Sequence, residues 1–355
     1  MRKKEISTLK VAATYIGTVV GAGFASGQEI LQFFAVFKGR GLLGLIIVTV
    51  LFMVFGYIIM DLGQRLNSKS HLEIIKHSGG KYIGTVTDYL ITFFLFGALT
   101  AMIAGSGAMF TQQFNLSSIW GTTIMAVITA ATVLTGIQGV ISSISFVVPF
   151  LITSAVGVSI ASVFFVPPNV TPTPIPVAVS TTPSGLVQNW LLAAILYVSY
   201  NTVLAIAVLG PLGAEAKKRK SIVNGALLGG LGLGLGSIAI YFALSNSLNN
   251  LFNVEIPMAF IAGRISYTIQ IVYVIVLLAE VYTTAVGSLY GFTARVTDMN
   301  GRRTKVFIIG TTVAAFVASQ FGFSNLVKYM FPIVGYGGIV LLLSLVYSKI
   351  KLRRL

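Results

Sequence analysis

The chain has 355 residues, of which 55% are hydrophobic and 9% charged, and its mean hydropathy is +0.90. A soluble domain carries about a quarter charged residues, so this composition excludes a water-soluble globule and indicates an integral membrane protein. The chain has no cysteine and two histidines, which excludes thiolate metal sites and cysteine nucleophiles. The 24 Lys and Arg against 9 Asp and Glu give a net charge of +15, and the position of these residues decides what that charge means.

Ten apolar runs are long enough to cross a bilayer, which takes about 20 residues. They are 9–37, 41–65, 86–114, 119–138, 142–166, 186–214, 221–246, 265–294, 304–321 and 325–348. The Pro- and Thr-rich segment 167–185 separates the fifth run from the sixth and cannot be a helix interior. The sequence therefore predicts one all-α membrane domain in which 1–166 and 186–355 form two five-helix halves, joined by an outer loop.

The basic residues are distributed unequally between the two sides of this partition. When both termini are placed in the cytoplasm, all but four of the 24 Lys and Arg fall on the inner side. The exceptions are Lys38, Arg40, Arg264 and Lys328. The positive-inside rule predicts this bias, so the charge indicates a membrane topology and not nucleic-acid binding. The first run is too long for the core of a cleaved signal peptide, so we expect it in the mature protein.

Five runs on each side of the outer loop would give two halves of opposite orientation. Inverted-repeat transporters have this arrangement, and their sites lie at mid-membrane in interrupted helices. The first run carries GTVVGAGFASGQE at 17–29, with four glycines and Glu29 at hydrocarbon depth, which a lipid-facing helix would not tolerate. Close packing through GxxxG pairs is the alternative, but it does not account for Gln28 and Glu29. The sequence predicts interruptions here and at Ser199–Thr202 in the sixth run.

The eighth run has a polar stripe. Its members follow helical i, i+3, i+4, i+7 and i+8 spacing and are Glu280, Thr283, Thr284, Gly287 and Ser288. A polar stripe must face a helix interface or a cavity, and oxygen ligands suit a hard cation such as sodium. Threonine hydroxyls also bond to their own helix, so each one alone is equally consistent with a structural role.

The glycine-rich string at 17–23, GTVVGAG, resembles the G-x-x-V-G-x-G at the first-helix break of sodium-coupled members of the amino acid–polyamine–organocation (APC) superfamily. The ten spans are similar to the LeuT-type 5+5 fold of that superfamily. The longer string GTVVGAGFASGQE also resembles the YkvI-like amino-acid permeases of Gram-positive bacteria. The resemblance implies a secondary active transporter and not an enzyme. It would import a small amino acid or related amine with sodium by alternating access.

The resemblance also implies two adjacent sites. Expected substrate-binding residues are Gly21, Ala22, Gly23, Phe24, Ser199, Tyr200, Asn201 and Thr202, with the N–H groups of Ala22 and Gly23 given to a substrate carboxylate. Expected ligands of a sodium ion are the carbonyls of Gly17, Val20 and Glu280 and the hydroxyls of Thr283 and Thr284. Proton-driven relatives can fill this site with a lysine from the fifth helix, and 142–166 contains no Lys or Arg, which favours sodium. Phe24 stands where sodium-coupled amine transporters have an asparagine, so a second sodium is not expected.

Glu29 and Glu280 depart from the pattern, because such relatives are mostly neutral at these depths. Either carboxylate could neutralise a substrate ammonium, carry a coupled proton or pair with a buried donor, since burial disfavours the charged form. Two other interpretations stay open: a proton-coupled symporter or exchanger of the same fold, and a membrane channel or sensor without active transport. No organic cofactor is expected. The expected coupling ion is Na⁺, with H⁺ as the alternative, and the expected partners are a small-molecule substrate and the lipid bilayer.

Overall fold

The computed structural model describes residues 6–68, 71–135, 150, 153–162, 164, 165, 186–216, 218–251, 254–297 and 303–353, and these form helices and no strand. Seven helices in this part of the chain are long and apolar enough to cross a membrane. They are α4 (Gly39–Leu66), α5 (His71–Phe114), α8 (Trp190–Glu215), α9 (Arg219–Ser245), α11 (Tyr267–Val296), α12 (Thr304–Ala318) with its extension η3 (Ser319–Phe321), and α13 (Phe323–Arg353).

The remaining elements are shorter. They are α1 (Thr8–Val19), α2 (Ala22–Ala25), α3 (Gln28–Phe33), η1 (Ala35–Phe37), α6 (Ser118–Leu134), η2 (Leu248–Asn250) and α10 (Pro257–Ile265). A short apolar helix also covers Thr153–Ser162 within the predicted fifth span. Most of that span and the outer loop 167–185 lie outside the described residues.

Local sequence explains where several helices begin. The side chains of Ser7 and Asn189 cap α1 and α8 by accepting hydrogen bonds from backbone N–H groups three residues on. Pro257 occupies the first turn of α10, where its missing N–H costs no hydrogen bond. Helix α5 starts well before the predicted run at 86, and Gly80 (φ 70°) marks a kink within it. Glycine is suited to this left-handed backbone conformation because it has no Cβ.

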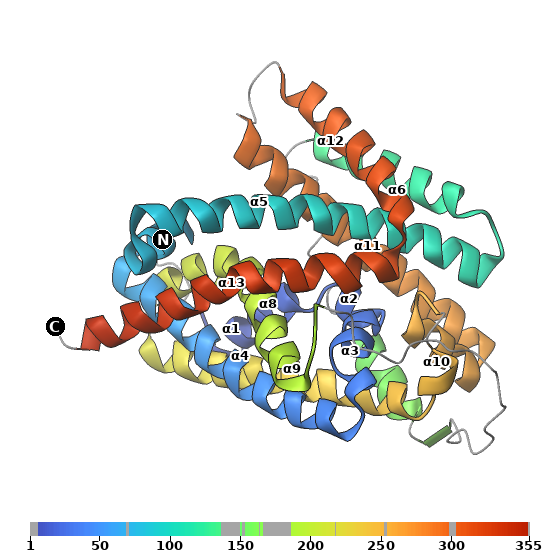
Figure 1. Ribbon diagram of the computed structural model, residues 1–355, viewed down its shortest axis with the longest axis horizontal. Helices are drawn as coiled ribbons and strands as arrows, with labels where there is room; N and C mark the ends of the chain where they lie inside the picture. The colour runs from blue at the N-terminus through green and yellow to red at the C-terminus, as the bar shows by residue number, and fades with distance from the viewer. Residues whose placement is uncertain are drawn as a thin grey trace.

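The helices form two groups of four. Helices α1, α4, α8 and α9 pack together, and α5, α6, α11 and α12 form the second group, while α13 packs against both α5 and α8 (Figure 1). Each group takes two helices from each half of the chain, as expected for a fold built from two related five-helix halves. The close approach of α4 and α8 depends on glycine. A Cβ at Gly63 on α4 would overlap the carbonyl of Gly210 on α8, and a Cβ at Gly213 on α8 would overlap the carbonyl of Met60 on α4.

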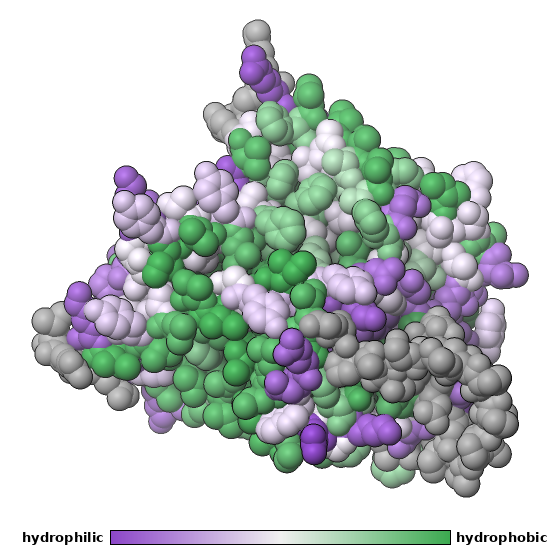
Figure 2. All heavy atoms as spheres, viewed as in Figure 1, coloured by the Kyte–Doolittle hydropathy of each residue, from purple (hydrophilic) through white to green (hydrophobic). Residues whose placement is uncertain are grey.

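Apolar side chains cover much of the outer surface. Large residues such as Val127, Leu235 and Leu343 are at least 60% exposed. Figure 2 shows broad apolar areas across one face of the molecule, with hydrophilic side chains between them and at its edges. Exposed apolar surface on this scale marks contact with lipid, so the chain is an integral membrane protein.

Candidate functional site

The first span is interrupted where the sequence predicts it. Helix α1 ends at Val19, and Val20 and Gly21 are extended, with Gly21 at φ −120° and ψ −175°. Helix α2 then begins at Ala22, and Gly27 (φ 79°) separates it from α3. Helix ends leave N–H and carbonyl groups without intrahelical partners, so this span exposes backbone hydrogen-bonding groups in the interior of the protein.

The predicted interruption of the sixth span is wrong. Helix α8 runs unbroken from Trp190 to Glu215 through Ser199–Thr202. The polar side chains there are satisfied without opening the backbone, since Ser199 Oγ donates to the Gly335 carbonyl at 2.7 Å and Asn201 Nδ2 to the Tyr197 carbonyl at 2.9 Å. No glycine occurs between 190 and 209 to favour a break. The candidate site is therefore built around one broken helix.

Glu29 lies beside this break. It is 6% exposed on α3, and its carboxylate turns back onto α2, where a Cβ at Gly23 would overlap Oε1. The other oxygen, Oε2, accepts a hydrogen bond from the Tyr200 hydroxyl at 2.6 Å. Three residues that the sequence singled out, Gly23, Glu29 and Tyr200, are thus brought together from the first and sixth spans.

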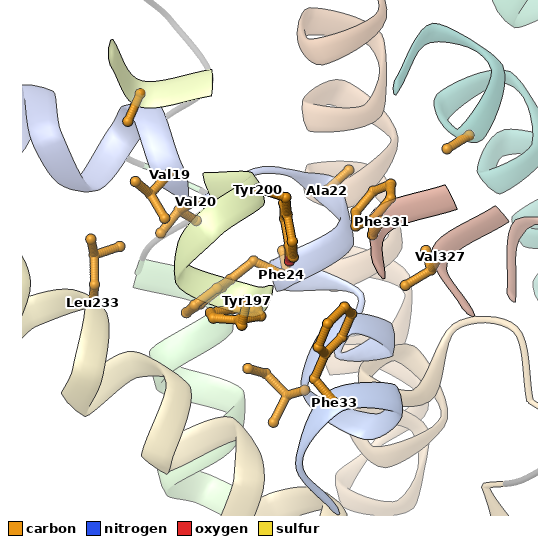
Figure 3. Close-up of a cluster of buried hydrophobic side chains, with 14 of the residues drawn as sticks. Val19, Val20, Ala22, Phe24, Phe33, Tyr197, Tyr200, Leu233, Val327 and Phe331 are labelled. Atoms are coloured by element: carbon orange, nitrogen blue, oxygen red, sulfur yellow. The ribbon is translucent and has the colours of Figure 1, made fainter. Parts of the chain in front are cut away.

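Aromatic rings surround Tyr200. Its ring centroid lies 5.1 Å from that of Phe331, 5.4 Å from Tyr197, 5.6 Å from Phe33 and 5.8 Å from Phe94. Figure 3 shows several of these rings converging beside α2. The sequence analysis missed all four neighbours. Helical spacing could have indicated two, since Tyr197 precedes Tyr200 by three residues and Phe33 follows Glu29 by four. Phe94 and Phe331 come from distant helices and carry no local signal.

The other predicted substrate residues lie in different surroundings. Gly21 faces open space, with no heavy atom within 4 Å of where its Cβ would be. Ala22 is buried, and the Phe24 ring points toward α9, where its Cζ would lie 3.4 Å from a Cβ at Gly236. Thr202 is buried on α8. Ser199 and Asn201 bond to backbone carbonyls, so the structure does not bring them to Glu29.

Glu280 forms a second buried acidic centre, on α11. It is 4% exposed, and its Oε1 and Oε2 each accept a hydrogen bond at 3.3 Å, from Thr284 and Thr283 respectively. The Thr283 hydroxyl also lies 3.0 Å from the Glu280 carbonyl. The predicted hydroxyl ligands and the carboxylate are therefore one cluster of oxygen atoms.

A hydrogen bond fixes α11 relative to the broken span. The Tyr273 hydroxyl donates to the carbonyl of Ala25, at the end of α2. Glu280 follows Tyr273 by seven residues, so it lies on the same face of α11 about two turns further along. This face is the one turned toward the first span.

Both central carboxylates are without a cation. Among the described residues, no Lys, Arg or His lies within 4 Å of Glu29 or Glu280, whereas Asp61 and Asp88 both have such partners. A buried carboxylate is costly unless it is paired or hydrogen-bonded. The interior thus holds two acidic groups whose compensation by protein is limited to hydroxyl donors.

Comparison with known proteins identifies the family. No family model matches the chain. Its sequence is 31% identical over 358 residues to the membrane protein YkvI of Bacillus subtilis (strain 168), covering 100% of this chain and 99% of that protein. The chain belongs to the YkvI family of membrane proteins.

Solved structures show the fold of this YkvI-family protein. The complex of MhsT with L-phenylalanine matches it with a TM-score of 0.60 at 17% identity, covering 96% of this chain and 89% of MhsT. Inward-facing Mhp1 matches with a TM-score of 0.55 at 14% identity, covering 94% and 74% respectively. The YkvI-family chain therefore has the LeuT-type fold that the first-helix glycine string indicated.

Proposed function

We propose that this YkvI-family protein is a secondary active transporter that imports a small amino acid or related amine together with sodium. The observation that carries the proposal is the helix break at Val20 and Gly21, with a buried, cation-free carboxylate in the broken span and another on α11. Free backbone groups and uncompensated charge destabilise a fold, so their presence at its centre favours a role in binding. We place the protein in a bacterial plasma membrane with both termini in the cytoplasm.

The fold comparison supports this proposal. MhsT has been seen with L-phenylalanine, and a further structural match, with a TM-score of 0.59, is a sialic acid symporter described as Na⁺-coupled. Transport by this chain would use the broken first span and α11, which the hydrogen bond between Tyr273 and the Ala25 carbonyl holds together.

The proposed sodium site lies between the break and α11. Glu280, Thr283 and Thr284 supply side-chain oxygens, and the carbonyls of Gly17 and Val20 would face them across the helix interface. The resemblance assigned the Glu280 carbonyl to the ion. Its carboxylate is the better ligand here, because it lies among the hydroxyls and carries the charge that a cation would neutralise.

Sodium at this position would couple ion binding to gating. An ion that contacts both the first span and α11 binds best to the conformation in which the two are close. A ligand shifts a conformational equilibrium only through such a difference in affinity. Sodium would therefore favour the state that holds substrate, and its release would allow the opposite state to open.

Uptake into proteoliposomes tests the ion assignment. We expect Thr284→Ala to abolish sodium-dependent uptake of labelled substrate, because it removes a hydroxyl from the oxygen cluster. Thr293→Ala is the matched control, since Thr293 is buried on the same helix and bonds only to the Leu289 carbonyl. Thr284→Ala uptake equal to wild type at every sodium concentration would refute this site.

Proton coupling is the second candidate, and the cation-free carboxylates are the observation that favours it. Glu29 or Glu280 could compensate its buried charge by taking up a proton instead of a cation. A sodium-free uptake assay with an imposed pH gradient separates the two mechanisms. Uptake driven by the pH gradient alone would favour proton coupling.

A further inference from the structure

The Glu29 carboxylate lies beside α2, the segment that the resemblance assigns to a substrate carboxylate. The N–H groups of Ala22 and Gly23 are the expected partners of an α-amino acid's carboxylate, and a Cβ added at Gly23 would overlap Glu29 Oε1. A second negative group at α2 would lie next to Glu29. Two neighbouring negative charges repel each other strongly in a site from which water is excluded.

The same carboxylate is available to a cation. Glu29 accepts a hydrogen bond from Tyr200, interacts with the Tyr197 hydroxyl, and has no Lys, Arg or His within 4 Å in the described part of the chain. A carboxylate has about four lone-pair sites, so these hydroxyls leave acceptor capacity for an N–H donor. An ammonium group would supply both the missing donors and the missing charge.

The surrounding side chains also suit an organic cation. The rings of Phe33, Tyr197, Tyr200 and Phe331 are buried and lie within one cluster (Figure 3). The buried ring of Phe94 belongs to the same cluster, since its centroid is 5.8 Å from that of Tyr200. Aromatic faces attract cations, and cages of such rings recognise ammonium and methylated ammonium groups. The Tyr197 hydroxyl is buried in the same cluster and interacts with the Glu29 carboxylate and with Tyr200, so it forms part of the surroundings of that carboxylate.

The backbone at the break is open on one side. Gly21 adjoins α2, is only partly buried and has no heavy atom within 4 Å of its Cβ position. A small group could therefore enter beside the unwound backbone. At Gly23, two residues further along the chain, the Cβ position is already occupied by Glu29 Oε1.

We infer that the substrate is a cationic amine without a carboxylate, such as an alkylamine or methylated amine, and not a zwitterionic α-amino acid. The inference rests on the proposed transport function and narrows its substrate class. Glu29 binds the ammonium group, the aromatic cluster encloses it, and the site rejects a carboxylate by charge repulsion.

Matched ligand pairs test this directly. Each α-amino acid is compared with its decarboxylated amine: phenylalanine with phenethylamine, and valine with isobutylamine. Thermal stabilisation of the full-length protein in nanodiscs reports binding, and uptake into proteoliposomes reports transport. We expect the amine of each pair to raise the melting temperature and the amino acid to have no effect at the same concentration.

The variant Glu29→Gln keeps the shape of the side chain and removes its charge. We expect it to weaken amine binding roughly tenfold or more, because hydrogen bonds to a charged partner are among the strongest in proteins. Asp88→Asn is the control, since it removes a carboxylate remote from the break and should leave the amine response unchanged.

The possible outcomes separate the two proposals. Stabilisation by the amino acid equal to or greater than that by its amine would overturn the substrate class and leave transport intact. No stabilisation by any amine, or a full amine response in Glu29→Gln, would also overturn it. Amines that bind but are not taken up under sodium or proton gradients would support the binding site and refute the transport function.

Discussion

The buried carboxylates of Glu29 and Glu280 differ from those of Asp61 and Asp88, which lie beside basic side chains at the basic end of the molecule. Asp61, which is 2% exposed, contacts Lys349, lies 2.8 Å from Arg65 Nε and 4.0 Å from Arg219 Nε, and so has three cations around one carboxylate. Glu29 is buried to a similar extent, but its partners among the described residues are the hydroxyls of Tyr200 and Tyr197 and not cations. A carboxylate paired with cations from several helices links those helices, whereas our proposal assigns a carboxylate without such partners to a ligand cation.

The ion pairs of Asp61 at this basic end thus have a structural role. Asp61 lies on α4, Lys349 on α13 and Arg219 at the start of α9, so one carboxylate connects three helices. Lys349 also lies over the Tyr57 ring, with Nζ 4.7 Å from the ring centroid. The central carboxylates make no equivalent ionic connection. Substitutions at the two places should therefore affect different properties of the protein.

The largest effect on stability is expected from Asp61→Asn. This change leaves Lys349, which is 8% exposed, without its buried counter-charge. Removal of one partner from a buried ion pair costs about 3–5 kcal/mol. Unfolding of the purified protein in detergent measures the loss.

Two further variants sharpen this prediction. Combining Asp61→Asn with Lys349→Met removes both charges and should recover much of the lost stability, because an apolar replacement of a buried pair is often neutral. Glu29→Gln should not destabilise the protein, since no cation is left unpaired. If Glu29→Gln lowered stability as much as Asp61→Asn, the division between structural and ligand-binding carboxylates would be wrong.

The sequence predicted most of this arrangement because hydropathy and glycine content are local properties. The spans follow from apolar runs, and the break at Gly21 follows from a string of glycines that disfavours helix. Pairing of Asp61 and Asp88 with basic residues was also predictable, since Asp61 lies near the end of the apolar run 41–65 and Asp88 near the start of the run 86–114.

The remaining features depend on contacts between distant segments. Ser199 does not open α8 because its hydroxyl reaches Gly335, 136 residues away in the sequence. Phe94 and Phe331 meet Tyr200 only after α5, α8 and α13 have packed. The hydroxyls of Thr283 and Thr284 were expected to bind an ion together with the Glu280 carbonyl, and in the structure they donate to the Glu280 carboxylate. No periodicity within one span indicates which of these partners a side chain will find.

Gly23→Ala should have an intermediate effect, and we expect it to lower the affinity for the amine without lowering the stability of the fold. The added methyl overlaps Glu29 Oε1, which is the far end of a flexible side chain and can move away. The fold should therefore survive, while the displaced carboxylate loses its position beside Tyr200 and amine affinity falls roughly tenfold. Titration of amine-dependent thermal stabilisation measures this change.

The control for this variant is Gly310→Ala on α12. Gly310 has no heavy atom within 4 Å of its Cβ position, so alanine fits there and should leave both stability and amine affinity as in wild type. An unchanged amine affinity in Gly23→Ala would show that the carboxylate position at α2 has no part in substrate binding.

The smallest effect is expected from Asp88→Asn, which tests whether burial or pairing makes a carboxylate structural. Asp88 contacts Arg295 and lies 3.7 Å from His71 Nε2, but its side chain is 39% exposed. Solvent screens an exposed pair, so its loss should cost no more than about 1 kcal/mol and should cost less still at high salt. Unfolding measurements at low and high ionic strength distinguish the two explanations. A loss as large as that of Asp61→Asn would show that pairing with a cation, and not the burial of the carboxylate, makes a carboxylate structural.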